Sequence, residues 1–153
     1  MRRQNPSAPE PVARTPEPAE IRLGFFIAEP VPGAMRHRRT RNLGFRLPPW
    51  RVRHIISAVS QASGKHAADI LGPHRHTTFC HPRHVAMYIL ALSRADLSTP
   101  QIAGVFGRSD HSSVLHAIQV AQRRIASRAG VSRQVYDDAL ALLNTIPPLA
   151  VVS

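Results

Sequence analysis

The chain has 153 residues, of which 20 are basic and 9 acidic, and its formal net charge is +11. Domains usually have roughly 100–200 residues, so this length allows one domain with a tail. No run approaches the roughly 18 apolar residues of a membrane-spanning helix, and the N-terminus lacks the apolar core of a secretory signal. The single cysteine, Cys80, excludes an internal disulfide and indicates a reducing cytoplasm. The positive charge indicates a polyanionic partner, and nucleic acid is the first candidate.

The positive charge is concentrated in the middle of the chain. Residues 1–35 carry four arginines and four glutamates, whereas residues 36–133 carry fifteen arginines and Lys65 against three aspartates, a net charge of +13. Arginine supplies nineteen of the twenty cations, which favours forked contacts to phosphates over the point charges of lysine. The basic surface therefore belongs to the part of the chain that also carries the helical patterns.

Residues 1–48 are expected to form a mostly disordered tail rich in proline and arginine. Nine of the fourteen prolines fall in the first fifty residues, and this density prevents a continuous helix and removes donors that a sheet needs. The basic cluster at 36–41 (RHRRTR) is either a solvated part of this tail or an arm that contacts phosphates or a minor groove. The apolar run Leu23–Ala28 is either a strand or a docking segment, and the sequence does not decide between them.

Helical spacing of apolar residues begins after Pro49 and predicts a first helix that ends at Gly64. A short helical turn over 67–71 is expected next, followed by a basic loop over 72–81 (GPHRHTTFCH). Pro82 suits the first turn of the following helix, because the N–H that proline lacks would have no partner there. The apolar residues behind it predict a largely buried helix.

The next segment predicts a helix–turn–helix. Ser98 or Thr99 can cap a first helix, and Gly107 permits the left-handed conformation that commonly ends one. Ser109 or Asp110 can cap a second helix, whose apolar residues recur at helical spacing. In such a motif the second helix enters the major groove of DNA with its N-terminal residues at the base edges.

No strong strand pattern interrupts residues 50–146, so an all-α fold is predicted: a compact helical domain over this range, with a short tail at 147–153. Gly130 is expected to end the second helix of the motif, and Ser132 to cap a last helix.

The first residues of the second motif helix are the candidate base readers: Asp110, His111, Ser112 and Ser113. Imidazole and hydroxyl groups can donate or accept at base edges and phosphates, and a carboxylate can accept from cytosine N4. The alternative is that Asp110 only caps the helix and that the two serines are solvated. The surrounding charge favours DNA binding.

Four segments then carry an ordered set of motifs. Residues 110–117 (DHSSVLHA) match a DHTTVLHA signature with serine for each threonine, and Phe106-Gly107 matches an FG turn. Residues 81–88 (HPRHVAMY) match an RPRQ-x-AMY segment, and 68–71 (ADIL) is similar to ADLL. Together, over about residues 52–143, they resemble the C-terminal DNA-binding domain of the bacterial replication initiator family DnaA. The resemblance implies a sequence-specific domain that binds DnaA-box-like sites in double-stranded DNA at replication origins.

The resemblance implies a role for each matching residue. It implies that Arg75, in the loop before the third helix, enters the minor groove. It implies that Asp110, His111 and Ser112 read bases in the major groove. Arg108 supplies a cation one position before the family's usual arginine, where this chain has Ser109. The positions that match contacts to the phosphate backbone are Arg83, His84, Ser113 and His116.

The resemblance does not extend to the nucleotide-binding module of the full initiator. That module needs a G-x-x-x-x-G-K-[ST] loop, whereas the only Gly-Lys pair, Gly64-Lys65, is followed by His66 and has no glycine at the required distance. We therefore expect a stand-alone domain that is not an enzyme and that needs no nucleotide, cofactor or membrane. Its expected partners are double-stranded DNA and, by competition or contact, a full-length initiator.

Other functions remain open on the sequence alone. Within DNA binding, the alternatives are a transcriptional regulator at promoters and a non-specific nucleic-acid-binding protein. Catalysis would need an activated nucleophile, and Cys80 beside His81 offers adjacency alone. A zinc site would need nitrogen and thiolate donors at finger spacing. The donors present, whose spacing matches no standard finger, are His74, His76, Cys80, His81 and His84.

Overall fold

A computed structural model describes residues 45–127 and 130–149. Most of the tail predicted to be disordered, residues 1–48, lies outside the described ranges, including the basic cluster and the apolar run. Its last residues are described and bond to the end of α3: Leu47 N–H donates to the carbonyl oxygen of Leu92 at 3.1 Å, and the Ser93 hydroxyl donates to that of Pro48 at 2.6 Å. Within those ranges the chain forms six helices and no strand, which confirms the all-α prediction. No helix in this part of the chain is long and apolar enough to cross a membrane. The helices are α1 (Val52–Ser63), α2 (Ala67–Leu71), α3 (Thr77–Ser93), α4 (Thr99–Val105), α5 (His111–Ala126) and α6 (Val131–Leu143).

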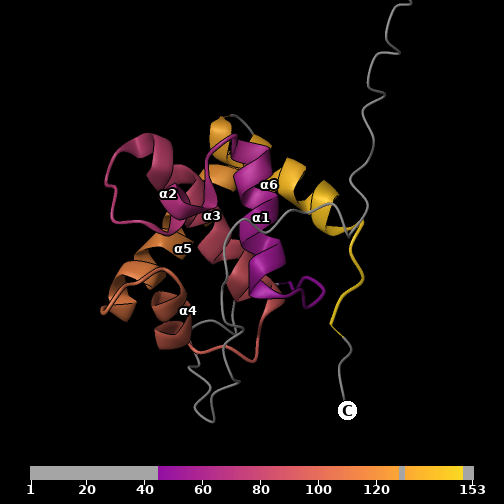
Figure 1. Cartoon of the computed structure of the whole chain (residues 1–153), viewed down its shortest axis with the longest axis horizontal. Helices are drawn as coiled ribbons and strands as arrows, with labels where there is room; N and C mark the ends of the chain where they lie inside the picture. Colours follow the sequence, from indigo (N-terminus) through magenta and orange to yellow (C-terminus); the bar gives the residue numbers. More distant parts are fainter. Residues whose placement is uncertain (1–44, 128–129, 150–153) are drawn as a thin grey trace, which may run out of the picture.

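Helix α3 is the centre of the fold. It contacts each of the other five helices, and every residue from Val85 to Ser93 is buried. A helix that is apolar on all sides is expected in the interior. The pairs α1–α6 and α4–α5 also pack together and both contact α3 (Figure 1). The two pairs thus lie around one buried helix.

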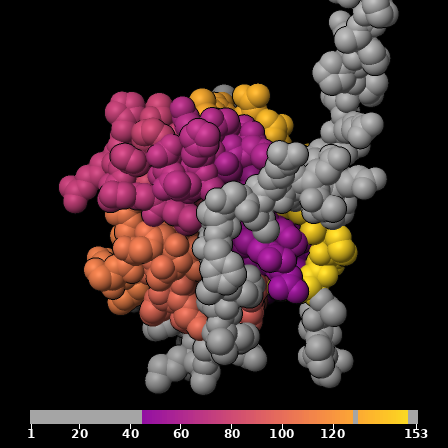
Figure 2. Space-filling model, viewed as in Figure 1, coloured from indigo at the N-terminus to yellow at the C-terminus, as the bar shows by residue number. Residues whose placement is uncertain are grey.

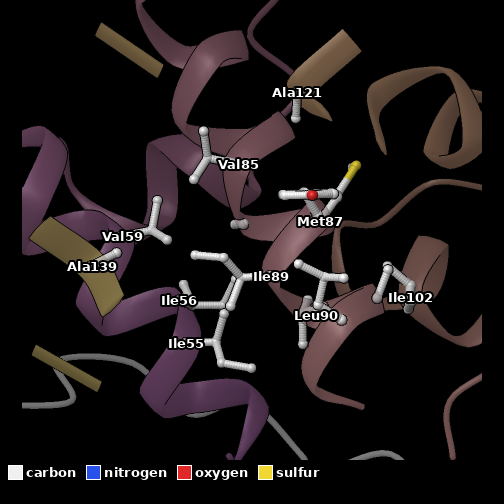
Figure 3. Packing of buried hydrophobic residues seen from close by; sticks show 14 of the residues in the cluster. Ile55, Ile56, Val59, Val85, Met87, Ile89, Leu90, Ile102, Ala121 and Ala139 are labelled. Carbon is white, nitrogen blue, oxygen red and sulfur yellow. The ribbon is translucent and has the colours of Figure 1, made fainter. Parts of the chain in front are cut away.

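The core is formed mainly by aliphatic side chains, and all six helices contribute to it. In Figure 3, Ile55 and Ile56 of α1 and Ile89 of α3 point into one cluster, and Leu90 of α3 points toward Ile102 of α4. All of these side chains are completely buried. Each contributes about 1.5–3 kcal/mol relative to an exposed position. This packing fixes the positions of α1, α3 and α4.

Trp50 joins the two ends of the folded region to the C-terminus of α3. Its indole N–H donates to the carbonyl oxygen of Ile146 at 3.2 Å, and its backbone N–H donates to Ser93 Oγ at 2.9 Å. Arg94 donates to the carbonyl oxygen of Trp50 and forms an ion pair with Asp96 at 2.8 Å. The buried indole therefore finds the polar partner that it needs.

The turn signals of the helix–turn–helix are confirmed. Ser98 caps α4 in a capping box with Gln101, in which each side chain bonds to the other residue's backbone N–H. Gly107 has φ 62°, and Gly64, at the end of α1, has φ 69°. Both positions require the left-handed conformation that glycine adopts without strain. Asp110, one of the two residues expected to cap α5, is its N-cap.

The start of α3 differs from the prediction. α3 begins at Thr77, so half of the expected basic loop is helical and Pro82 lies inside the helix. His76 caps the helix: its Nδ1 accepts from the backbone N–H of Thr78 at 3.3 Å. Proline removes the one hydrogen bond to the carbonyl four residues earlier, here that of Thr78 in the first turn. Pro82 is itself buried.

The junction between α5 and α6 also differs. α5 ends at Ala126, before Gly130, and Gly130 instead precedes α6 with φ 120°. Ser132, the expected cap, lies inside α6 and is buried. The positive φ at this position favours glycine. The sequence pattern could not show whether Gly130 ends α5 or precedes α6.

Candidate nucleic-acid interface

Two segments that the sequence singles out lie on one side of the molecule. In Figure 1, α2 with the loop after it lies above α4 and α5 on the left, and Figure 2 shows their surfaces adjoining there. Burial and then the charge of Arg108 lower the pKa of the Arg83 guanidinium. Arg108 lies in the α4–α5 turn and Arg83 beside the α2–α3 loop, so this coupling also places the two segments close together.

The N-terminus of α5 is exposed and held by its own side chains. Oδ1 of Asp110 accepts from the backbone N–H of Ser112 at 2.9 Å, and Oδ2 accepts from the hydroxyl of the same serine. The hydroxyl of Ser113 donates to the carbonyl oxygen of Asp110 at 2.7 Å. The hydrogen bonds from Ser112 hold the pKa of Asp110 below its usual value. Asp110, His111, Ser112 and Ser113 all stand on the surface at the first turn of α5.

His84 and His116 come together between α3 and α5. His116 is exposed and His84 is half-buried. Burial lowers the pKa of His84 to about 4, with further lowering by the charges of Arg124, Arg83, His116 and His81. Its ring is therefore neutral at physiological pH, and Nδ1 is buried without a hydrogen-bond partner among the described residues.

Arg124 is a cation of this surface that the sequence reasoning missed. Its charge lowers the pKa of both His81, after burial, and His84. It follows His116 by two helical turns on α5, so the two share one face. That spacing is the signal that could have identified it.

Arg75 is exposed in the short loop between α2 and α3. Two contacts hold its neighbour His74: Nε2 lies 3.6 Å from Oδ1 of Asp69, and the ring contacts Phe79 in a tilted arrangement with centroids 5.0 Å apart. At Gly72 a Cβ would approach the carbonyl oxygen of Ala68 to 2.9 Å, so the turn leaves no room for a side chain. The loop thus presents Arg75 from a tightly folded backbone.

The phosphate contact predicted for Arg83 stays a prediction, and the structure shows the side chain turned inward. Its side chain is only 3% exposed, and its guanidinium bonds to backbone carbonyls of the segment that precedes α3. All three guanidinium nitrogens donate to backbone carbonyls inside the protein. A motif match identifies the residue at a position but does not show which way its side chain points.

The donors considered for zinc do not converge. Among residues 45–127 and 130–149, no three histidine, cysteine or acidic side chains are grouped so that they could hold a metal ion. His76 caps α3, and Cys80 faces the carbonyl oxygen of Arg75 at 3.1 Å. The fold gives these residues separate structural partners.

Comparison with known proteins finds a family model and several relatives that match this part of the chain. Residues 52–120 match the family model described as bacterial dnaA protein helix-turn-helix. The chain is similar to the chromosomal replication initiator protein DnaA of Cutibacterium acnes, with 34% identity over 98 residues, 64% of this chain and 19% of that protein. It is 33% identical over 110 residues to the protein of the same name from Rhodopseudomonas palustris, covering 71% of this chain and 23% of that protein. The match to the Xanthobacter autotrophicus protein of that name is 37% over 96 residues, 61% of this chain and 19% of that protein. The matched region spans about a fifth of these relatives.

Proposed function

We propose that the domain whose residues 52–120 match the bacterial dnaA helix–turn–helix family model binds DnaA-box-like sites in double-stranded DNA, at replication origins. The observation that carries the proposal is the placement of two exposed reading segments on one side of the molecule: the first turn of α5 and the loop that carries Arg75. The proposal places the protein in the cytoplasm, with the chromosome.

In the proposed complex, α5 enters the major groove with its N-terminus toward the bases. His111 and Ser112 donate to or accept from base edges, and the Asp110 carboxylate accepts from cytosine N4 or orients the Ser112 hydroxyl. Arg75 enters the adjacent minor groove, where a narrow, electronegative groove attracts a guanidinium. Reading from both grooves fixes the register of the domain on its site.

The phosphate backbone is contacted by the groups that surround these readers. Ser113 and His116 lie beside the base-reading residues on α5, and the neutral ring of His84 offers one N–H donor between α3 and α5. Arg108 and Arg124 supply the charge, so counterion release makes binding sensitive to salt. These contacts position the domain without reading sequence.

A domain that occupies the boxes of the initiator competes with it for DNA. We propose this competition as the protein's effect on replication. Occupancy across the genome separates it from the alternative: enrichment at origins supports it, whereas enrichment confined to promoters assigns the domain to transcription.

Selection of duplexes from a random pool tests the proposal directly. The wild-type protein is expected to enrich one DnaA-box-like motif, and His111→Ala is expected to lose that enrichment while still retaining DNA at low salt. Gln134→Ala, an exposed substitution on α6, is the control and is expected to select the wild-type motif. A wild-type protein that enriches no motif would falsify sequence-specific binding.

A further inference from the structure

The side chain of Arg83 is bonded to the backbone that leads from α2 into α3. Nε donates to the carbonyl oxygen of Ile70 at 2.6 Å, and Nη1 donates to that of His74 at 2.7 Å. Nη2 donates to the carbonyl oxygens of Asp69 and Gly72 at 3.2 and 2.8 Å. All three nitrogens of the guanidinium are therefore used inside the protein.

Cys80, one turn before Arg83 on α3, holds the end of the same segment. Its Sγ lies 3.1 Å from the carbonyl oxygen of Arg75 and 3.9 Å from that of His74, so the thiol donates to this backbone. Nη1 of Arg83 lies 3.8 Å from the same Sγ. We call Cys80 and Arg83 the loop clamp. Together they bind the carbonyls of residues 69, 70, 72, 74 and 75.

Holding these carbonyls fixes the backbone on both sides of Arg75 and with it the direction of its Cα–Cβ bond. A peptide group is planar, so fixing its oxygen also fixes the bonds to the adjoining Cα atoms. The carbonyls on both sides of the Arg75 Cα, those of His74 and Arg75 itself, are held by the clamp. The Arg75 side chain is left exposed while its backbone is fixed.

We propose that Arg83 is the positioning residue of the minor-groove contact: it sets the sequence preference of the domain by holding Arg75 in place, without touching DNA itself. The inference rests on the proposed function. Binding is stronger and more selective when the reading group is ordered beforehand, because less conformational freedom is lost in the complex.

Arginine is required at this position by geometry rather than by charge alone. Its planar fork presents five N–H donors in fixed directions, whereas lysine presents three donors on one nitrogen. Arg83→Lys keeps the positive charge but cannot reach four carbonyls that face the fork from different sides. It is therefore the variant that separates positioning from electrostatic attraction.

The test is a double-mutant cycle with Arg75→Ala, Arg83→Lys and the double variant. For each protein, binding is compared between the selected duplex and a duplex changed only at the base pairs that Arg75 contacts. Each single variant is expected to reduce this preference by about tenfold. The double variant is expected to be no worse than Arg75→Ala, because Arg83 acts only through Arg75.

Three results would contradict the proposal. Independent effects, which would multiply to about a hundredfold loss in the double variant, would overturn the proposal, as would an unchanged preference in Arg83→Lys. In the Arg75→Ala background, a further flattening of the salt dependence by Arg83→Gln would reveal a direct phosphate contact instead. Arg133→Gln, on α6, is the control for loss of a cation and is expected to keep the wild-type preference.

Loop order in the DNA-free protein tests the clamp separately. Amide relaxation at residues 74–76 is expected to show a rigid loop in the wild type and a mobile one in Arg83→Lys, with Cys80→Ala intermediate. Equal order in all three proteins would overturn the clamp even if the domain reads sequence. If the wild type lacks sequence preference but the loop loses order as expected, the proposed function and the recognition role of Arg83 fail while the clamp stands. Thermal unfolding of each variant confirms that the binding data come from folded protein.

Discussion

The two segments proposed to read DNA are held by interactions of different range. At the start of α5, hydrogen bonds join Asp110 to Ser112 and Ser113, two and three positions away. In the α2–α3 loop, the bonds from Arg83 reach His74 and Asp69, 9 and 14 positions away. Short-range bonds form as the helix forms, whereas long-range bonds require α2 and α3 to be packed. The recognition helix is thus capped locally, and the loop is ordered by the tertiary structure.

Removing the long-range bonds is expected to have the largest effect on stability. Arg83→Met leaves four backbone carbonyls without their donor, and we expect the free energy of unfolding to fall by about 2–4 kcal/mol. Urea denaturation followed by circular dichroism measures this loss. A decrease no larger than that of Arg133→Gln would show that water replaces the guanidinium at little cost.

Substitution at the recognition helix is expected to change sequence preference and to leave the fold intact. Ser112→Ala removes one hydroxyl at the base edges and is expected to reduce discrimination between the selected and a mismatched duplex by about 1–3 kcal/mol. The neighbouring Ser113→Ala is the matched control, expected to weaken binding equally for all sequences. Equal losses of discrimination in both variants would contradict the division between base and phosphate contacts.

The stability of the fold is expected to depend on pH through His84, which lies between α3 and α5. The pKa of His84 is lowered to about 4 in the folded protein, whereas the unfolded chain binds this proton near pH 6.5. Stability is therefore complete above about pH 6.5 and falls as the pH drops toward 4. We expect a loss of about 1–2 kcal/mol, because solvent reaches part of the ring and screens the arginine charges.

Urea titrations at several pH values measure this dependence. His84→Gln is expected to reduce the slope between pH 6.5 and 4 and to leave a residual slope from His81 and His54, whose pKa values are also lowered, mainly by burial. A slope unchanged in His84→Gln would assign the pH dependence to those two residues.

The smallest effect is expected at the local cap. Asp110→Ala removes the acceptor for the Ser112 backbone N–H, but this end of α5 is open to water, which takes its place. The pKa of Asp110 is lowered, so any stabilisation that it gives is present at neutral pH and is lost as the pH falls below its usual value near 4. Thermal unfolding at pH 7 should show a smaller shift than Arg83→Met, and a larger shift would reverse the comparison between the two regions.

The elements marked by local signals were predictable from the sequence. The helix–turn–helix follows from Ser98, Gly107 and Asp110, which act within their own turns. The start of α3 was not predictable, because a histidine cap and an internal proline are both unusual. Exposure of the base-reading candidates also followed from the pattern, since they precede the buried residues of α5.

The candidate site likewise has one part that the sequence determined and another that depends on the tertiary structure. The sequence by itself determined the helical fold, the turn of the motif and the residues at the first turn of α5, because caps, glycines and helical periodicity act over a few positions. Only the tertiary structure decided that Arg83 faces the backbone of the loop and that Arg124 lies near His84. A sequence motif records which residue stands at a position, whereas the direction of a long side chain depends on which partners packing brings within its reach. Arg83 donates to four backbone carbonyls between α2 and α3, and it therefore helps to hold the backbone that carries Arg75.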